Sequence, residues 1–328
     1  MVPPVHSIAL GNFQASFVIP GPHGLVLYGN PGATGKPIGP AGGYALYYYD
    51  FAAKRVETIA TPTPASDGTV RGVLGASAAG DWVVYVIADG TTGHWQLWAW
   101  NAVTGVRTLI DSATKEHSQV QLGGDFAADG TDVVWSAAVE PNGFIEQALR
   151  EYTLATGKTR TLISGANAPI MHPLAMANGA LFFDEAQSPS NTTYGTYLWV
   201  LDQSKPVRVS DEPPANATMN DRYIVWDQPH TMTLTLYDRV TGKVTDDWVT
   251  SCIRPSIALD RPYLVCLDYD TSTFRLVEIP SGREVPFFPG QASGAGGGMV
   301  ANGRDYWVAT TATDEYSNHI DYIDLPAN

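Results

Sequence analysis

Charged residues are scarce in this chain of 328 residues. They make up 16% of the sequence, against roughly 25% in typical soluble domains. Glycine and proline, with 32 and 23 copies, take part of their place together with Ser, Thr and Asn. These residues form tight turns, and many short turns are typical of an all-β protein. Hydrophobic residues, at 44%, are sufficient for a folded core.

Basic residues are the scarcer of the two charged kinds. Nineteen Lys and Arg stand against 33 Asp and Glu, which gives a net charge of −14. A field of this sign repels the phosphate backbone of nucleic acid and an anionic membrane surface, so the sequence excludes both as partners. A simpler interpretation is that the net negative charge keeps the protein soluble. We expect the protein to be a monomer.

Long apolar runs are also missing. No segment approaches the roughly 20 apolar residues that a membrane-spanning helix needs, so we expect no membrane insertion. The start of the chain lacks the basic flank and apolar centre of a signal peptide. Few Lys and Arg with many Thr, Ser, Asn and aromatic residues are nevertheless common in exported bacterial proteins. We therefore expect a secreted or cell-envelope location, with the numbered chain as the mature form behind an added Met1.

Cysteine occurs only twice, as Cys252 and Cys266. The two residues flank a predicted hairpin that turns near Asp260, and antiparallel neighbours come within reach of a disulfide. We predict this bridge, with two buried free thiols as the alternative. A bridge favours an oxidising compartment.

A short apolar segment recurs seven times along the chain. Successive copies are separated by 57, 50, 48, 43, 40 and 42 residues, near the roughly 40–50 residues of a propeller repeat. A second strand follows each copy, and in four repeats a Thr-Gly or Ser-Gly turn leads into a third, as hairpins require. The copies end at Tyr28, Tyr85, Trp135, Phe183, Trp226, Cys266 and Val308.

The repeats predict an all-β fold, a seven-bladed β-propeller of four-stranded antiparallel blades, named A to D from first to last strand. Many strands are apolar on both faces, as a blade between two neighbours requires. The seventh repeat stops after its third strand, while residues Val5 to Leu10 belong to no repeat. We therefore predict that the N-terminal strand completes and closes the last blade, and that residues 1–328 form a single domain.

The repeated pattern resembles a known family. The segments Gly130-Thr-Asp-Val-Val-Trp135 and Leu236-Tyr-Asp-Arg-Val-Thr-Gly242 show the pattern best, within residues 130–163 and 221–244. The pattern is similar to the TolB-like repeats of bacterial propellers, which are relatives of WD repeats. The resemblance covers nearly the whole chain and implies the fold. Such propellers resemble binding scaffolds of the cell envelope, but the same shape also carries enzymes, so no catalytic residue can be transferred.

One face of the predicted propeller carries the long, variable B–C loops, for example residues 29–43, 140–146 and 184–196. Long loops on a rigid scaffold commonly hold binding groups. A cluster of His, Arg and carboxylate groups near this face is suited to a sugar, an acidic ligand or a metal. The alternative is that these side chains cap turns and pair with one another. The predicted ligand-binding residues are His172, Asp184, Asp227, His230, Arg254 and Asp268.

Motifs for a metal, a cofactor or a nucleophile are missing. Residues 268–272 begin like a calcium loop but lack its Gly and distal Glu, and the Gly-rich residues 293–298 lack the Lys of a phosphate loop. No histidine pair has the helical zinc spacing, and no Gly-x-Ser-x-Gly occurs. We therefore expect no metal site, no cofactor and no identifiable catalytic residue.

Three functions are compatible with these observations. The sequence favours an exported, non-catalytic scaffold that binds a protein or glycan ligand, with Tyr194, Tyr269 and Tyr316 as aromatic platforms. The alternative is a carbohydrate-active enzyme, a polysaccharide lyase or glycoside hydrolase, with its site on the B–C loop face. There His172, His230 and Arg254 would act as base and charge stabilisers. The third is a structural propeller from a longer surface protein.

Overall fold

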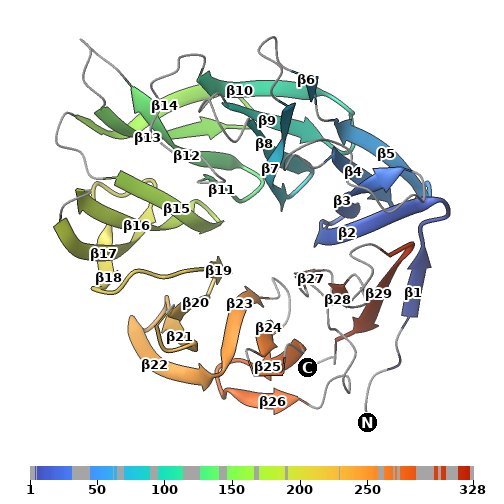
Figure 1. Cartoon of the computed structure of the whole chain (residues 1–328). Coiled ribbons are helices and arrows are strands. Elements are labelled where there is room, and N and C mark those ends of the chain that lie inside the picture. Colours follow the sequence, from blue (N-terminus) through green and yellow to red (C-terminus); the bar gives the residue numbers. More distant parts are fainter. Residues whose placement is uncertain are drawn as a thin grey trace. The chain divides into compact units, whose positions relative to one another are not determined.

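The chain is described from a computed structural model. The description covers residues 4, 6–31, 45–61, 63–64, 70–88, 95–113, 126–139, 146–165, 170–188, 191–228, 230–257, 262–268, 270–271, 274–285, 299–301, 304–307 and 317–325. All named elements are strands, and every pairing between them is antiparallel (Figure 1). Within these residues no helix is long and apolar enough to cross a membrane.

The chain forms two compact units, which are described separately. The first contains residues 1–40, 44–61 and 215–328, and the second contains residues 41–43 and 62–214. The prediction of one domain over residues 1–328 stays a prediction.

The first unit contains four sheets, each of four strands. The sheet β2-β3-β4-β5 comes first along the chain, followed by β19-β20-β21-β22 and β23-β24-β25-β26, and the sheet β1-β29-β28-β27 joins both ends. The strands are β1 (His6–Ala9), β2 (Phe13–Pro20), β3 (Gly24–Pro31), β4 (Ala45–Asp50), β5 (Arg55–Ala60), β19 (Ala217–Met219), β20 (Tyr223–Gln228), β21 (Thr233–Asp238), β22 (Lys243–Thr250), β23 (Cys252–Ile257), β24 (Tyr263–Asp268), β25 (Phe274–Glu278), β26 (Arg283–Val285), β27 (Met299–Ala301), β28 (Arg304–Trp307) and β29 (His319–Asp324).

The second unit contains three sheets, β6 to β10, β11 to β14 and β15 to β18, with neighbouring strands adjacent in sequence. The strands are β6 (Thr63–Pro64), β7 (Val70–Ala79), β8 (Trp82–Ala88), β9 (Trp95–Asn101), β10 (Arg107–Ala113), β11 (Phe126–Ala128), β12 (Asp132–Val139), β13 (Glu146–Thr153), β14 (Lys158–Gly165), β15 (Ile170–Ala177), β16 (Ala180–Ser188), β17 (Asn191–Val200) and β18 (Val207–Ser210).

The predicted count of seven four-stranded blades is wrong. Six sheets of the described structure have four strands, and the sheet β10-β9-β8-β7-β6 has five. The additional strand β6 pairs with β7, with Thr63 opposite Arg71. It lies within the longest interval between repeats, the 57 residues from Tyr28 to Tyr85. The sequence pattern assigned four strands to every repeat and gave no sign of this fifth one.

The N-terminal strand completes the last sheet, as predicted. Strand β1 pairs with β29, with Ile8 opposite Ile320 (Figure 1). Ser7 Oγ donates to Asp321 Oδ1 at 2.5 Å, and Ile8 packs against a core cluster that includes Ile320. The end of the sheet is thus covered by a strand from the other end of the chain.

The turns between third and fourth strands explain the Asp-x-x-Thr-Gly pattern. Asp238 Oδ1 accepts hydrogen bonds from the backbone N–H groups of Val240 at 2.9 Å and Thr241 at 3.1 Å. Gly242 follows at a φ of 71°, in the left-handed region that glycine enters without strain. Asn101 makes the same contacts in the second unit, to Val103 and Thr104.

The sheet β23 to β26 is buried on both faces. Leu264 and Cys266 point into a cluster shared with strands β20 to β22, whereas Val265, between them, packs with Ile323. Successive side chains of a strand point to opposite faces, so an apolar strand without polar alternation is what two-sided burial produces. This packing joins β20 to β23 and β24 through one buried apolar cluster.

Candidate functional site

Cys252 connects three segments of the first unit. Its N–H donates to Met232 O at 3.1 Å, and it lies opposite Asp268 in the register of β23 and β24. Its sulfur bonds to Cys266, with the two Cα atoms 5.7 Å apart, which confirms the predicted disulfide. We call this region the disulfide edge: residues 227–228 and 230–232, residues 252–254, and Asp268.

A bulge next to the disulfide sets the position of Arg254. Ile253 pairs with Leu267 and Ser256 with Val265, so Arg254 and Pro255 together oppose Cys266 alone. Proline, which has no N–H to offer the ladder, is found in sheets at such bulges. Bulges beside functional sites change the direction of a side chain.

The backbone of Arg254 is strained. Its φ is 51°, in the left-handed region, and such a conformation in a non-glycine residue costs on the order of 1–3 kcal/mol. Four of the six non-glycine residues with positive φ in the described structure lie between Met232 and Arg254. Two of these four, Met232 and Arg254, lie at the disulfide edge.

Asp227 holds this conformation from the adjacent sheet. Its Oδ2 accepts the N–H of Arg254 at 2.9 Å and the Asn216 Nδ2 at 2.9 Å, and its Oδ1 accepts the N–H of Asn216 at 2.6 Å. The side chain is buried, with 2% exposure. A buried carboxylate needs such donors, and here they connect β20 to β23. The carboxylate of Asp227 thus supports the backbone of the edge.

His230 lies exposed on a hydrogen-bonded turn. The N–H of Met232 donates to Gln228 O at 3.0 Å, and Thr231 Oγ1 lies 3.2 Å from Gln228 Oε1. Thr233 continues this network, at 2.7 Å from Thr231. The imidazole is therefore presented by a turn that its neighbours fix on both sides.

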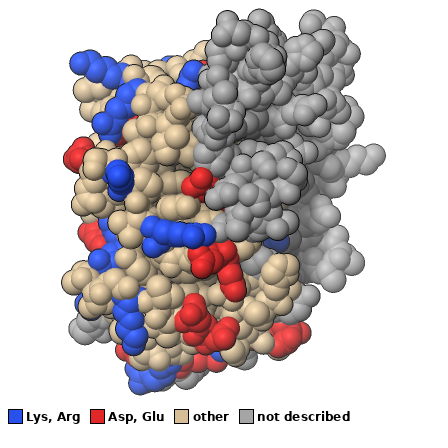
Figure 2. All heavy atoms as spheres, turned by 90° about the vertical axis from the view of Figure 1, so that its left-hand side faces the viewer, with Lys and Arg blue, Asp and Glu red and all other residues tan. Residues whose placement is uncertain are grey.

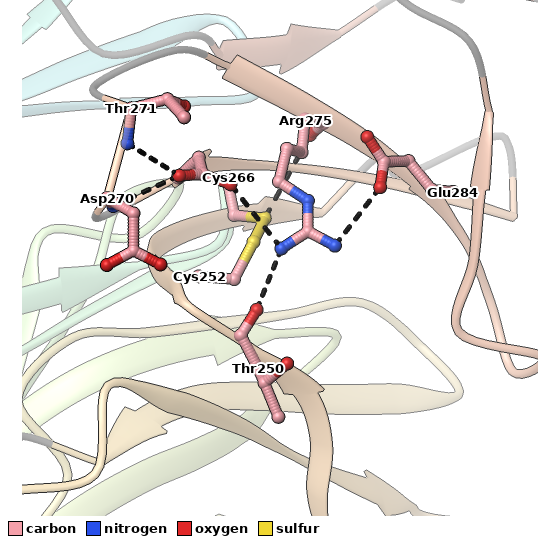
Figure 3. Close-up of polar contacts among 8 residues, drawn as sticks. Thr250, Cys252, Cys266, Asp270, Thr271, Arg275 and Glu284 are labelled. Carbon is pink, nitrogen blue, oxygen red and sulfur yellow. Dashed lines mark hydrogen bonds and ion pairs between the residues drawn. A yellow bond between two sulfur atoms is a disulfide. The ribbon is translucent and has the colours of Figure 1, made fainter.

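Asp268 lies opposite Cys252 in the register of β23 and β24, and Figure 3 shows the disulfide from Cys252 to Cys266. Asp268 Oδ1 accepts the N–H groups of Asp270 at 3.0 Å and Thr271 at 2.8 Å, and its Oδ2 lies 3.7 Å from Arg275 Nη1. Arg275 also donates to Thr250 O at 2.7 Å and to Glu284 Oε2 at 3.2 Å. Both charges are used within the fold, beside the disulfide.

His172 and Asp184 belong to the second unit. They are Cα partners on β15 and β16, and Asp184 is buried with 9% exposure. Both residues make further contacts within the fold. The structure therefore brings the six predicted residues together in two groups, these two in one unit and Asp227, His230, Arg254 and Asp268 in the other.

The sequence pattern placed His172 and Arg254 just before the first strand of a repeat and the three Asp residues just after a second strand, and this placement is wrong. His172, Asp184, Asp227, Arg254 and Asp268 lie inside or at the ends of strands, and only His230 lies in a turn. The hydrogen bonds between strands use backbone groups only, so a strand can continue through a residue with a polar side chain. In the sequence pattern such a residue marks the end of the strand. The turn-capping alternative describes Asp268, while Asp227 caps the backbone of a neighbouring sheet.

Other predicted elements lie outside the described residues. These include loop residues 32–43 and 140–145, the Gly-rich residues 293–298, Tyr269 and Tyr316, and the side chain of Tyr194.

Sequence reasoning missed Asn216 and Gln228, which hold Asp227 and the His230 turn. No local signal marks them, because their roles depend on contacts between strands. Within the described residues, no group of three or more His, Cys, Asp or Glu is arranged to hold a metal ion.

The charge at the surface is sparse. In the view of Figure 2 most described atoms belong to uncharged residues, with cationic and anionic side chains scattered among them.

No family model and no curated protein matches the sequence. Solved structures do match. The β-propeller domain of the Trilobed protease from Pyrococcus furiosus is 10% identical, with 96% of each chain covered and a TM-score of 0.62. The chain has a β-propeller fold. The TolB-like repeat family, finer than the fold, stays a prediction.

Two further structures agree with this fold. An oligogalacturonate lyase in complex with manganese is 9% identical, with 99% of this chain and 97% of that chain covered and a TM-score of 0.59. A prolyl endopeptidase is 14% identical, with a TM-score of 0.60 over 98% of this chain, which spans about half (51%) of the endopeptidase. At these identities the similarity shows the fold alone, and propellers carry many functions.

Proposed function

We propose that this β-propeller is a binding scaffold that holds a protein or glycan ligand at the disulfide edge and does not catalyse a reaction. One observation carries the proposal: His230 and Arg254 are exposed, while the backbone beneath each is fixed. The fixing contacts are Asp227 to the Arg254 N–H and Met232 to Cys252. A backbone that is fixed before a ligand arrives loses little freedom on binding, which favours affinity.

Binding demands less of this edge than catalysis does. A catalytic base needs a partner that orients it and a group that stabilises developing charge. Among the described residues, no carboxylate contacts the His230 imidazole, and the nearby Asp227 and Asp268 are engaged with backbone N–H groups. These contacts support a surface that recognises rather than one that transfers protons.

The second candidate is a carbohydrate-active enzyme with its site at the same edge. An exposed imidazole and an exposed guanidinium on one edge are a base and a charge stabiliser, which a lyase or hydrolase needs. The similarity of the fold to an oligogalacturonate lyase is compatible with this candidate.

We also propose that the protein acts outside the cytoplasm, secreted or in the cell envelope, as a monomer. The disulfide supports the location, because such bonds persist in oxidising compartments.

A binding screen tests the proposal. The purified protein is assayed against acidic and neutral polysaccharides and against candidate protein partners, with and without divalent metal. We expect a ligand whose affinity falls about tenfold or more in His230→Ala or Arg254→Ala, as for the loss of a contact worth about 1.4 kcal/mol. The control is Arg283→Ala, in an exposed ion pair with Glu278.

The same screen separates the two candidates. New unsaturated or reducing sugar ends that disappear in His230→Ala would establish the enzyme and overturn the binding scaffold. A ligand whose affinity neither edge variant changes would place the binding surface elsewhere.

A further inference from the structure

We propose that the guanidinium of Arg254 binds a single carboxylate group of the ligand. This inference rests on the proposed function and specifies the ligand chemistry at the same edge. Three properties of Arg254 support it: its missing partner, its backbone and its electrostatic surroundings.

Arg254 differs from the other described arginines of the first unit in having no partner among the described residues. Each of the others contacts an acceptor of the fold. Those contacts are Arg55 with Glu57, Arg222 with Asp238, Arg239 with Asn220 O, Arg275 with Glu284, Arg283 with Glu278 and Arg304 with Asp324. In a chain with 33 acidic and 19 basic residues, an exposed cation that no acid among the described residues contacts is available to a ligand.

The backbone conformation of Arg254 costs free energy. Its positive φ suits glycine or asparagine better than arginine. The bulge, the Asp227 hydrogen bond and the disulfide two residues earlier together maintain this conformation. Strained residues held in this way occur at ligand-binding sites, and a bulge directs the side chain away from the regular ladder. The strain thus has a use if it orients the guanidinium.

The surroundings favour one negative charge over several. A guanidinium is a planar fork that matches a carboxylate through two parallel hydrogen bonds. The net charge of −14 repels a polyanion, and the carboxylates of Asp227 and Asp268 lie at the same edge. A singly charged carboxylate is therefore a better ligand than a phosphate, which carries nearly two charges.

The test uses matched probes that differ only in charge. Glucuronate is compared with glucose, and N-acetylglycine with N-acetylglycinamide, by following the arginine Nε–Hε NMR signals of the full chain. We expect a saturable shift of one arginine signal with a carboxylate probe at millimolar concentration, and no shift with its neutral counterpart. Arg254→Gln should remove that signal and the binding, while Arg283→Gln should retain both. The two carboxylate probes distinguish a sugar acid from a peptide terminus as the source.

Two results would overturn the inference. The first is equal binding of the carboxylate and neutral probes. The second is a carboxylate affinity that is the same in wild type and in Arg254→Gln, which includes the case that neither protein binds. A neutral ligand from the screen that loses affinity in His230→Ala but not in Arg254→Gln would reject the carboxylate and leave the binding scaffold intact. A screen without any ligand would instead reject the proposed function.

Discussion

Replacing Arg254 with asparagine should stabilise the protein. Asparagine tolerates the left-handed region better than arginine, and the N–H that donates to Asp227 belongs to the backbone, so the hydrogen bond is retained. Because the arginine side chain is exposed and has no partner among the described residues, its removal loses little packing.

The expected gain follows from the relieved strain. A left-handed non-glycine residue costs about 1–2 kcal/mol, of which we expect asparagine to recover about 1 kcal/mol. For domains of 150–250 residues, 1 kcal/mol raises Tm by roughly 2–4 °C, and a longer chain lies at or below the lower end. Arg254→Gly should gain less, because glycine adds about 0.5–1 kcal/mol of unfolded-state entropy.

Urea unfolding followed by tryptophan fluorescence measures this difference, with Arg283→Asn as the control. Arg283 is an exposed arginine without a positive φ, so its substitution should change the free energy of unfolding by less than about 0.5 kcal/mol. If Arg254→Asn were less stable than wild type by more than the control, the strain argument would be refuted. A stabilised variant that has lost ligand binding is the combination that the account predicts.

Three further predictions concern the support of the site. Replacing Cys252 and Cys266 together with serine should cost about 3 kcal/mol of unfolding free energy, the amount expected for a closed loop of about 15 residues; two thiols reacting with Ellman's reagent in denatured, unreduced wild type would show that the bond is absent. Deleting residues 1–10 should lower Tm because β1 no longer covers β29, whereas deleting residues 1–4 should not; equal melting of the two deletions would contradict the closure. Burial raises the pKa of Asp132, with the charge of Glu151 adding to it and the Thr153 hydrogen bond opposing it. A raised folded-state pKa means that stability falls as pH rises above the ordinary value of 3.8, so Asp132→Asn should be the more stable form at pH 7 and flatten this dependence; a variant less stable than wild type at pH 7 would contradict the shift.

The parts of the fold that the sequence predicted correctly depend on local chemistry. The Asp-x-x-Thr-Gly pattern locates turns because Asp238 and Gly242 each act within a few residues of their own position. The closure by β1 followed from counting strands, and the disulfide from the two positions beside one hairpin. The fifth strand β6 was missed because two residues that pair at an edge carry no periodic signal.

The site was less accessible to sequence reasoning because it is assembled from contacts between strands. Asp227 was selected as a ligand-binding residue for the same reason that it is structural: a carboxylate at the end of a buried strand serves either use. Only the three N–H donors that surround its carboxylate show that Asp227 has a structural role. The sequence likewise does not show the positive φ of Arg254, or that its side chain has no partner in the described part of the chain. The following Pro255 is compatible with a bulge.

Hydrogen exchange measured by mass spectrometry, with and without a saturating ligand from the screen, tests the central claim most directly. If the ligand binds at the disulfide edge, protection should increase in peptides that contain residues 227–232 and 252–254. The turns at residues 238–242 and 278–283, at the other ends of the same sheets, should not change. Protection of those turns, or of neither region, with a bound ligand would contradict the account.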